Sequence, residues 1–288
     1  MSVKALDFPV MTGIEFAKGH GTGNDFIVIP DLNDDLDLHP RLIQALCDRH
    51  RGIGGDGVLR VVRSVDHGYF MDYRNADGSV AEMCGNGARV FARYLVDKSY
   101  HSAGEFSFDT RSGLIWANCP GDGDVSITMG RASDRGIQAP TDVTFGERSW
   151  SGMAVWAPNP HAVVMVTELD ALDEVSGAPL VDPTIFPEGV NVEFVQSIAP
   201  GHVSIRIIER GVGETLSCGT GACAVAWALP RMLDTSASRR EHEVGPVRVD
   251  VPGGTVWVHE SSDGELTLTG PAVLVAEGHV DPIWWSQQ

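Results

Sequence analysis

Lysine and cysteine are scarce in this chain of 288 residues, and long apolar runs are absent from it. The five cysteines form no Cys-x-x-Cys pair and no dense group, which argues against a disulfide framework or a zinc site and favours a reducing compartment. No apolar run approaches the length of a membrane span, and the N-terminal segment lacks the apolar core of a signal peptide. We therefore expect a cytoplasmic protein.

Positive charge is also low. Lysine and arginine number 21 against 39 aspartates and glutamates, which gives a formal net charge of −18. Such a surface repels phosphate backbones and anionic lipids, so we expect neither nucleic acid nor membrane as a partner. The three lysines, Lys4, Lys18 and Lys98, lie in no phosphate-cradling context, and the loop Gly19 to Asp25 lacks the Gly-x-Gly-x-x-Gly spacing of dinucleotide sites. We expect no cofactor and no metal.

Two similar motifs stand out, Cys84-Gly85-Asn86-Gly87 and Cys218-Gly219-Thr220-Gly221. Each is followed by an apolar, alanine-rich run that is typical of a buried helix. Each cysteine is therefore predicted to stand where a helix begins. The first N–H groups of a helix have no partner within it, so we expect them to shift the thiol toward thiolate and to bind a carboxylate beside it.

The spacing of the motifs indicates an internal duplication. The offset from Cys84 to Cys218 is 218 − 84 = 134, and the same offset relates Asn75 to Glu209. The offset from Asn24 to Asn159, each of which precedes an apolar run, is 159 − 24 = 135. A period this long predicts two copies of one domain. We place one half at residues 1–131 and the other at 132–271, with the crossover in Arg131 to Ser151.

Short segments with strand-like patterns dominate the rest of the chain. We predict a helix over Pro40 to His50 with Cys47 in the core, and a loop rich in serine and arginine after Pro230. The apolar tail Ile283-Trp284-Trp285 is expected to pack against the protein. Strands are predicted by alternation and turn residues, at 58–62, 69–74, within 106–129, from His161 through Val166, and at 203–208, 247–251, 255–259 and 266–268.

Two thiols that face each other can invert a carbon centre. One thiolate removes a proton from a Cα atom, and a thiol on the opposite side returns one. His161 and Glu209 are the titratable residues close to the paired motifs. Hydrolysis by one cysteine with His161 as base is the competing chemistry, and it leaves the second motif unexplained. Asn24 and Asn75 are equally compatible with roles as turn residues.

Several motifs together closely resemble the diaminopimelate epimerase family from about Ile14 to Gly278. They are Gly23-Asn24-Asp25-Phe26, Tyr73 to Ser79, Glu82 to Arg89, Asn159-Pro160-His161, Asn191 to Phe194, Glu209 to Thr215 and Cys218 to Gly221. The resemblance implies an α+β, β-rich fold of two pseudo-symmetric domains, each a curled, barrel-like sheet around a central helix. It also implies that residues 272–288 return to the first domain, and that the protein forms a homodimer.

The same resemblance implies interconversion of LL- and meso-diaminopimelate, on the route to lysine and peptidoglycan, without cofactor or metal. Carried over by position, Cys84 and Cys218 are the acid/base pair, assisted by His161 and Glu209. The expected substrate contacts are Asn24, Asn75, Asn159, Asn191 and Arg210, with Gly85, Asn86, Gly219 and Thr220 binding the carboxylate at the reacting centre.

The chain departs from the family at Gly55-Asp56-Gly57, where many relatives carry a bulky residue and then Asp-Gln, so we assign no substrate contact there. Proline racemases and hydroxyproline epimerases also use two cysteines, but a site with four asparagines and Arg210 is large for proline. Phenazine-pathway isomerases of this fold lack the cysteine pair. A binding protein for a dicarboxylic amino acid is a further alternative, although binding alone needs no thiol at either helix start.

Overall fold

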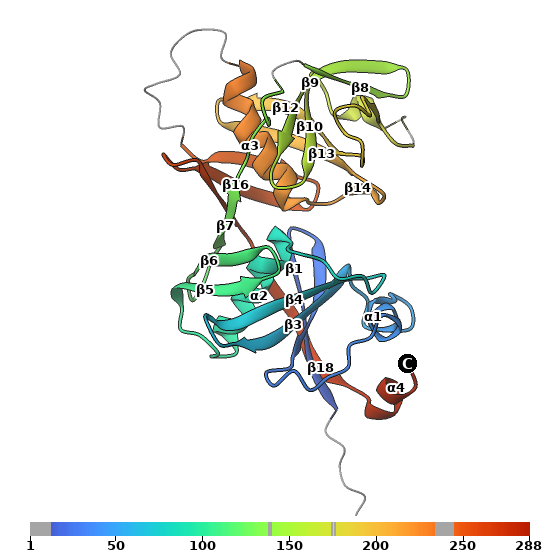
Figure 1. Cartoon of the computed structure of the whole chain (residues 1–288), viewed down its shortest axis with the longest axis vertical. Helices are drawn as coiled ribbons and strands as arrows, with labels where there is room; N and C mark the ends of the chain where they lie inside the picture. Colours follow the sequence, from blue (N-terminus) through green and yellow to red (C-terminus); the bar gives the residue numbers. More distant parts are fainter. Residues whose placement is uncertain (1–12, 138–139, 174, 176, 234–244) are drawn as a thin grey trace, which may run out of the picture.

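The protein consists of two lobes stacked along its long axis, each with one central helix wrapped by strands (Figure 1). The computed structural model describes residues 13–137, 140–173, 175, 177–233 and 245–288. Helix α2 (Gly85–Asp97) lies in one lobe and helix α3 (Gly219–Leu233) in the other. The predicted fold class, two curled sheets around central helices, is confirmed.

The lobe around α2 contains strands from both ends of the chain. They are β1 (Ile14–Gly21), β2 (Asn24–Pro30), β3 (Gly57–Ser64), β4 (Gly68–Asn75), β5 (Gly104–Thr110), β6 (Gly113–Cys119), β7 (Val125–Arg131) and β18 (Val273–Val280). Strand β18 pairs antiparallel with β1, with Val280 opposite Ile14. Val90, Phe91, Tyr94 and Leu95 of α2 are fully buried, because the helix is enclosed by this sheet.

The lobe around α3 holds the other strands and a short 3-10 helix, η1 (Asp170–Leu172). The strands are β8 (Thr141–Phe145), β9 (Arg148–Trp156), β10 (Pro160–Val166), β11 (Leu180–Val181), β12 (Asn191–Ala199), β13 (His202–Glu209), β14 (Gly213–Thr215), β15 (Val247–Val251), β16 (Gly254–Glu260) and β17 (Glu265–Gly270). Strand β17 pairs antiparallel with β7, and this ladder joins the two lobes into one hydrogen-bonded sheet.

The duplication predicted from spacing is visible in strand register. In the first lobe β2 and β3 are parallel, with Val28 opposite Leu59. In the second lobe β10 and β12 are parallel, with Val163 opposite Glu193. The two pairs are related by offsets of 163 − 28 = 135 and 193 − 59 = 134, the values found in the sequence. The domain limits at residues 131 and 271 stay a prediction.

Two smaller helices differ in detail from the sequence predictions. Helix α1 (Pro40–Cys47) buries Cys47 as expected, but it ends before His50 because Asp48 Oδ1 accepts the N–H groups of His50 and Arg51 and turns the chain. In α4 (Pro282–Ser286), the two tryptophans pack against the core, as predicted. The prediction is wrong for Ile283, whose side chain is 63% exposed.

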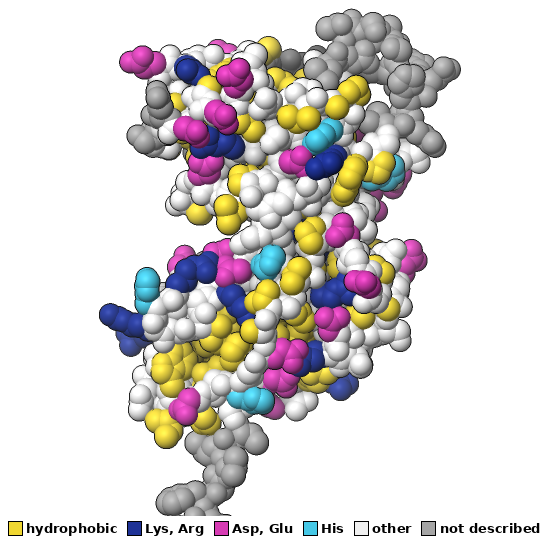
Figure 2. Space-filling view, turned by 180° about the vertical axis from the view of Figure 1, so that it is seen from behind, with side chains coloured by type: hydrophobic (Ala, Val, Ile, Leu, Met, Phe, Trp, Pro, Cys, Tyr) yellow, Lys and Arg dark blue, Asp and Glu magenta, His cyan; other side chains and the backbone are white. Residues whose placement is uncertain are grey.

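The structure also bears on the predicted absence of membrane-spanning segments and on the predicted loop after Pro230. Among the described residues, no helix combines the length and apolar character needed to cross a membrane. The serine- and arginine-rich loop after Pro230 lies largely in residues 234–244, outside the described residues. Acidic side chains are spread over both lobes on the face in Figure 2, in keeping with the net charge of −18.

Candidate active site

The two central helices meet at their N-terminal ends. A β-carbon built on Gly219, the first residue of α3, would lie 3.3 Å from Cα of Gly85, the first residue of α2. Cys84 and Cys218 immediately precede these two glycines, so the helix contact brings both cysteines to the junction of the lobes (Figure 1). The glycines allow this approach because they lack a side chain.

A polar network ties the two helix starts together. Asn86 in the first turn of α2 is 1% exposed and donates through Nδ2 to the carbonyl oxygen of Ser217, at 3.2 Å. The hydroxyl groups of Thr22 and Ser217 lie 2.6 Å apart. These bonds join segments that are distant in the chain, and they hold the residue before Cys218 against the first lobe.

Asn24, at the start of β2, contacts Cys84. The Cys84 thiol donates to Asn24 Oδ1 at 3.5 Å, and Asn86 Nδ2 donates to the same oxygen at 3.3 Å. The other end of the Asn24 amide, Nδ2, donates to Asp56 Oδ2 at 2.7 Å. Both ends of this amide are thereby fixed, so Asn24 is a rigid neighbour of the thiol.

Cys218 is more enclosed than Cys84. Its side chain is 9% exposed, whereas Cys84 is partly buried. Gly221 donates its backbone N–H to the Cys218 sulfur at 3.4 Å, and the Thr220 hydroxyl lies 3.3 Å from the same atom. The sulfur thus accepts from the first turn of α3, as the motif predicted.

The thiols are nevertheless shifted in the direction opposite to our expectation. Burial raises the pKa of Cys84 above its ordinary value of 9.0, although the N–H groups of Asn86 and Gly87 act to lower it. Burial raises the pKa of Cys218 still more, with Glu209 and Glu193 adding to the effect. The prediction of a thiolate-favouring helix start is wrong, because removal from water outweighs the helix-start N–H groups.

His161 is fully buried at the start of β10 and is bonded on both sides of its ring. Nδ1 lies 2.7 Å from Glu193 Oε1, and Nε2 lies 3.0 Å from Asn159 Oδ1. Within the described chain, no hydrogen bond joins His161 to either cysteine. The histidine is therefore placed behind Asn159, with its ring held by Glu193.

Glu209 ends β13 at the place where Asn75 ends β4 in the first lobe. Its Oε1 accepts from the Thr215 hydroxyl at 2.5 Å. Burial raises the pKa of Glu209, the Thr215 hydroxyl lowers it and Glu193 raises it further. A partly buried carboxyl group with a raised pKa holds its proton more readily than an exposed one, which suits a role in proton transfer.

The other expected substrate residues lie at strand ends around the helix starts. Asn75 donates through Nδ2 to the Ser79 hydroxyl at 3.0 Å, which is the turn-holding role left open by the sequence. Asn191 Oδ1 accepts the backbone N–H of Arg210 at 3.0 Å. The exposed Arg210 side chain donates to the Glu188 carbonyl at 2.8 Å. No hydrogen bond in the described residues links these three to a cysteine.

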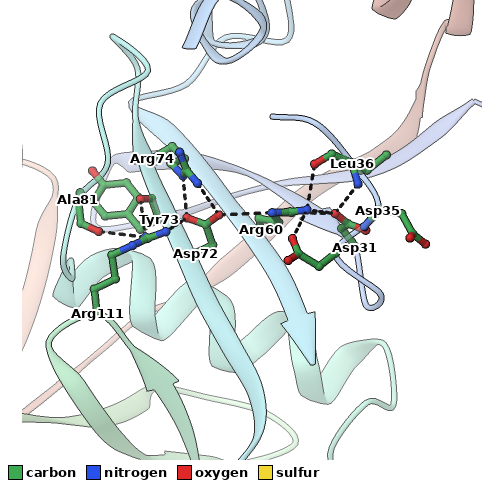
Figure 3. Close-up of polar contacts among 10 residues, drawn as sticks. Asp31, Asp35, Leu36, Arg60, Asp72, Tyr73, Arg74, Ala81 and Arg111 are labelled. Carbon is green, nitrogen blue, oxygen red and sulfur yellow. Dashed lines mark hydrogen bonds and ion pairs between the residues drawn. The ribbon is translucent and has the colours of Figure 1, made fainter. Parts of the chain in front are cut away.

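An ion-paired cluster supports the turn that leads to Cys84 (Figure 3). Asp72 on β4 is 3% exposed, and it pairs with Arg74 at 2.7 Å and with Arg111 at 2.5 Å. Arg111 also donates to the carbonyl oxygens of Tyr73 and Ala81, both at 3.3 Å. These bonds clamp the chain on either side of the turn that connects β4 to Cys84.

Three residues at this site were not predicted from the sequence. Glu193 holds His161, and Asp56 holds Asn24. Arg89 of α2 is fully buried and donates to Asn86 Oδ1 at 3.0 Å. A charged residue within an apolar helix or strand pattern is the signal that could have identified Glu193 and Arg89. Across the described ranges, no group of histidine, cysteine and acidic residues is arranged to hold a metal ion.

The chain is similar over most of its length to known proteins of one family. The family model described as diaminopimelate epimerase matches residues 16–134 and 153–275. The chain is 49% identical to a diaminopimelate epimerase of Streptomyces coelicolor, over 95% of this chain and 97% of that protein. It is 45% identical to one of Mycolicibacterium smegmatis, over 94% and 98%.

Solved structures with much lower identity share the fold. A phenazine biosynthesis protein of Bacillus anthracis superposes with a TM-score of 0.65 at 15% identity, covering 94% of this chain and 100% of that one. A hydroxyproline epimerase of Agrobacterium vitis gives a TM-score of 0.62 at 14% identity, covering 96% of each chain.

Proposed function

The chain belongs to the diaminopimelate epimerase family, and we propose that it interconverts LL-2,6-diaminopimelate and meso-diaminopimelate with Cys84 and Cys218 as the acid/base pair. The observation that carries this proposal is the contact between the starts of α2 and α3, which places one cysteine at each helix end. Inversion at a Cα atom needs an acid and a base on opposite faces of one carbon, and two thiols can serve in either direction.

The reaction is a proton transfer in two halves. One cysteine, as thiolate, takes the Cα proton and becomes a thiol, and the electron pair of the broken C–H bond stays on the substrate. The other cysteine, as thiol, gives its proton to the opposite face of that carbon and becomes a thiolate. The product has the inverted configuration, and the enzyme returns to its starting state when the two sulfurs exchange protons with their surroundings.

The helix starts supply the charge stabilisation. Negative charge develops on the substrate carboxylate as the Cα proton leaves, so donors aimed at that group lower the barrier. In the proposal, the N–H groups of Gly85-Asn86 and Gly219-Thr220 bind this carboxylate, since helix N-termini favour anions. The residues Asn24, Asn75, Asn159, Asn191 and Arg210 are assigned to the remaining amino and carboxylate groups of the substrate, and His161 and Glu209 assist the thiols.

The raised thiol pKa values bear on this mechanism. Burial holds the pKa of both thiols above the ordinary value, so in the proposal one of them must lose its proton before it can act as the base. In the proposal Glu209 assists this proton transfer, since its carboxylate acts on both thiols and adds to the rise in their pKa values. In the proposal, no step requires a cofactor or metal.

Solvent exchange tests the proposed function. The purified protein is incubated with LL-diaminopimelate in D₂O without pyridoxal phosphate, and deuterium at Cα and meso product are followed. We expect one solvent deuteron in each epimerised centre, and loss of product formation in both Cys84→Ala and Cys218→Ala. Exchange with proline but not with diaminopimelate would indicate a proline racemase. No exchange with either substrate would contradict an epimerase.

We also propose a compartment, an oligomeric state and domain limits for the enzyme. All five cysteines are free, and a pair of reduced thiols is suited to the cytoplasm.

A homodimer is proposed because apolar side chains remain exposed on the lobe around α2 (Figure 2), and Trp116 and Val275 are each 56% exposed. Sedimentation velocity should give a mass near twice 30.9 kDa. The proposed halves are residues 1–131 with 272–288, and 132–271.

A further inference from the structure

The internal duplication pairs two polar residues of the second lobe with two apolar residues of the first. In register, His161 corresponds to Phe26, since 161 − 26 = 135, and Glu193 corresponds to Leu59, since 193 − 59 = 134. The strand pairing supports this assignment, because Phe26 lies opposite Gly57 and His161 lies opposite Asn191, and 191 − 57 = 134. The two halves are thus alike in backbone and different in chemistry at these positions.

Phe26 and Leu59 lie beneath Gly87, and Glu193 lies beneath Gly221, the second glycine of each Cys-Gly-x-Gly motif. A β-carbon on Gly87 would meet Leu59 Cδ2 at 3.2 Å and Phe26 Cζ at 3.4 Å. A β-carbon on Gly221 would meet Glu193 Oε1 at 2.7 Å. The first turn of α2 therefore rests on an apolar pair, and the first turn of α3 rests on a carboxylate.

The polar pair is costly to bury. His161 and Glu193 are both 0% exposed, and Glu193 Oε2 has no hydrogen-bond partner among the described residues. A buried carboxylate with one open oxygen is less favourable than an apolar side chain of similar size. Because Phe26 and Leu59 fill the same place in the first lobe, the fold itself does not require a charged pair there. We therefore expect the His161–Glu193 pair to have a function in the active site at the start of α3.

The contacts of the pair show what it supports. Glu193 Oε1 lies 2.7 Å from His161 Nδ1, and the opposite ring nitrogen lies 3.0 Å from Asn159 Oδ1. A carboxylate accepts but does not donate, so Nδ1 must carry a proton in this bond. The Asn159 oxygen also only accepts, so Nε2 must carry a proton as well for the second bond to form. With both ring nitrogens as donors, the ring holds the Asn159 oxygen and leaves the Asn159 amide nitrogen to donate to a ligand.

We propose that Glu193 is a positioning residue, which accepts a hydrogen bond from His161 Nδ1 and, through the ring, orients Asn159 in the lobe that carries Cys218. This gives the Cys218 half of the site a polar support that the Cys84 half lacks. The catalytic consequence rests on the proposed epimerase function, whereas the proton on His161 Nδ1 does not depend on it. Glu193 itself acts through His161 and contacts no reacting atom.

The protonation of Nδ1 is tested by NMR of protein labelled with ¹⁵N-histidine. Long-range ¹H–¹⁵N spectra report which ring nitrogen carries a proton, and His161→Phe identifies the signals of His161. We expect a protonated Nδ1 in the wild type and in Glu193→Gln, whose amide oxygen can still accept, and an altered Nδ1 signal in Glu193→Leu. An unprotonated Nδ1 in the wild type, or an unchanged ring in Glu193→Leu, would overturn the proposal.

A double-mutant cycle tests the catalytic consequence. Glu193→Leu and His161→Phe install the residues of the first lobe, singly and together. Loss of an orienting partner lowers activity roughly 10- to 100-fold in comparable cases, and we expect Glu193→Leu to lower kcat/KM by this amount. Because both changes act through one ring, the double variant should be no slower than His161→Phe alone. Multiplicative losses would show that Glu193 does not act through His161.

The matched control is Glu260→Gln. Glu260 pairs with Arg231 near the opposite end of α3, so this change also removes a carboxylate that contacts the same helix. We expect kcat/KM within about twofold of the wild type, since this partly exposed pair contacts neither cysteine. If the wild type itself fails to exchange diaminopimelate, the epimerase function is contradicted, and the NMR experiment still decides the role of Glu193.

Discussion

The first residue of α3 lies against the first residue of α2, since a β-carbon on Gly219 would approach Gly85 Cα to 3.3 Å. Leu268 of β17 covers both positions, at 3.1 Å from a β-carbon on either glycine. This contact sets the separation of the two cysteines. The spacing of the acid and base on the two faces of the substrate therefore depends on two residues that have no side chains.

Gly219→Ala should harm activity more than stability. The added methyl group must move the helix starts or Leu268 by a few tenths of an ångström, and errors of about 1 Å in a reacting geometry can cost roughly 100-fold in rate. We expect kcat to fall about 10-fold or more, with the melting temperature lowered by only a few degrees. Gly121→Ala, whose added methyl would meet nothing within 4 Å, is the control. Equal activity of the two variants would contradict this role.

Arg89→Lys should disturb the Cys84 half of the site. Burial lowers the pKa of Arg89 to about 10, and its guanidinium donates to Asn86 Oδ1 at 3.0 Å and to Thr22 Oγ1 at 3.4 Å. A lysine cannot make this set of bonds, because it lacks the planar fork. Leaving buried acceptors unpaired costs about 1–3 kcal/mol each. Urea unfolding should show a loss of this size, and kcat/KM should fall because Asn86 loses its anchor.

The thiols should react slowly at neutral pH. Burial raises the pKa of Cys84, and it raises the pKa of Cys218 further, so the thiolate fraction of each increases only as pH rises beyond 9. Iodoacetamide labelling followed by peptide mass spectrometry should therefore accelerate across pH 7 to 10, with Cys84 labelled before Cys218. Cys223, whose pKa burial raises to about 12, is the internal unreactive reference. A labelling rate that is already constant below pH 7 would contradict the raised values.

The same shifts have a consequence for stability. A folded-state pKa above the unfolded value means that the folded protein holds its thiol protons more tightly. The stabilisation is fully present below about pH 9 and is lost as pH rises toward the folded-state values. Cys84→Ser, Cys218→Ser and the double variant should lose less stability than the wild type between pH 9 and 11. Urea unfolding at each pH gives the free energy of unfolding. If this free energy falls with pH as steeply in the double variant as in the wild type, the assignment is contradicted.

The sequence predicted the helix starts and the duplication because both depend on local residue types and fixed spacing. Cys84-Gly85 and Cys218-Gly219 identify two helix ends, and one constant offset relates them. The thiol pKa could not be predicted, since it depends on burial by β-strands far away in the chain. The role of Glu193 could not be predicted either, because it comes from packing under Gly221 and against His161, both distant from it in the sequence.

Removing the carboxylate of Asp72 should loosen the turn that leads to Cys84. Asp72 is buried among Arg60, Arg74 and Arg111, and these bonds hold the pKa of Asp72 below its ordinary value of 3.8 in spite of burial, which would raise it (Figure 3). Removing one partner of a buried pair costs about 3–5 kcal/mol. Asp72→Asn should show a loss in this range by urea unfolding at pH 7.

The pH dependence distinguishes this charge effect from a change in packing. Because the folded-state pKa of Asp72 is depressed, its stabilising contribution is present above pH 3.8 and is lost as pH falls through the lower folded-state value. The difference in stability between the wild type and Asp72→Asn should therefore shrink below pH 3.8. Asp263→Asn, at an exposed pair with Arg131, should show no comparable difference at any pH. A constant gap between wild type and Asp72→Asn down to pH 2 would mean that Asp72 stabilises the turn through its shape and not through its charge.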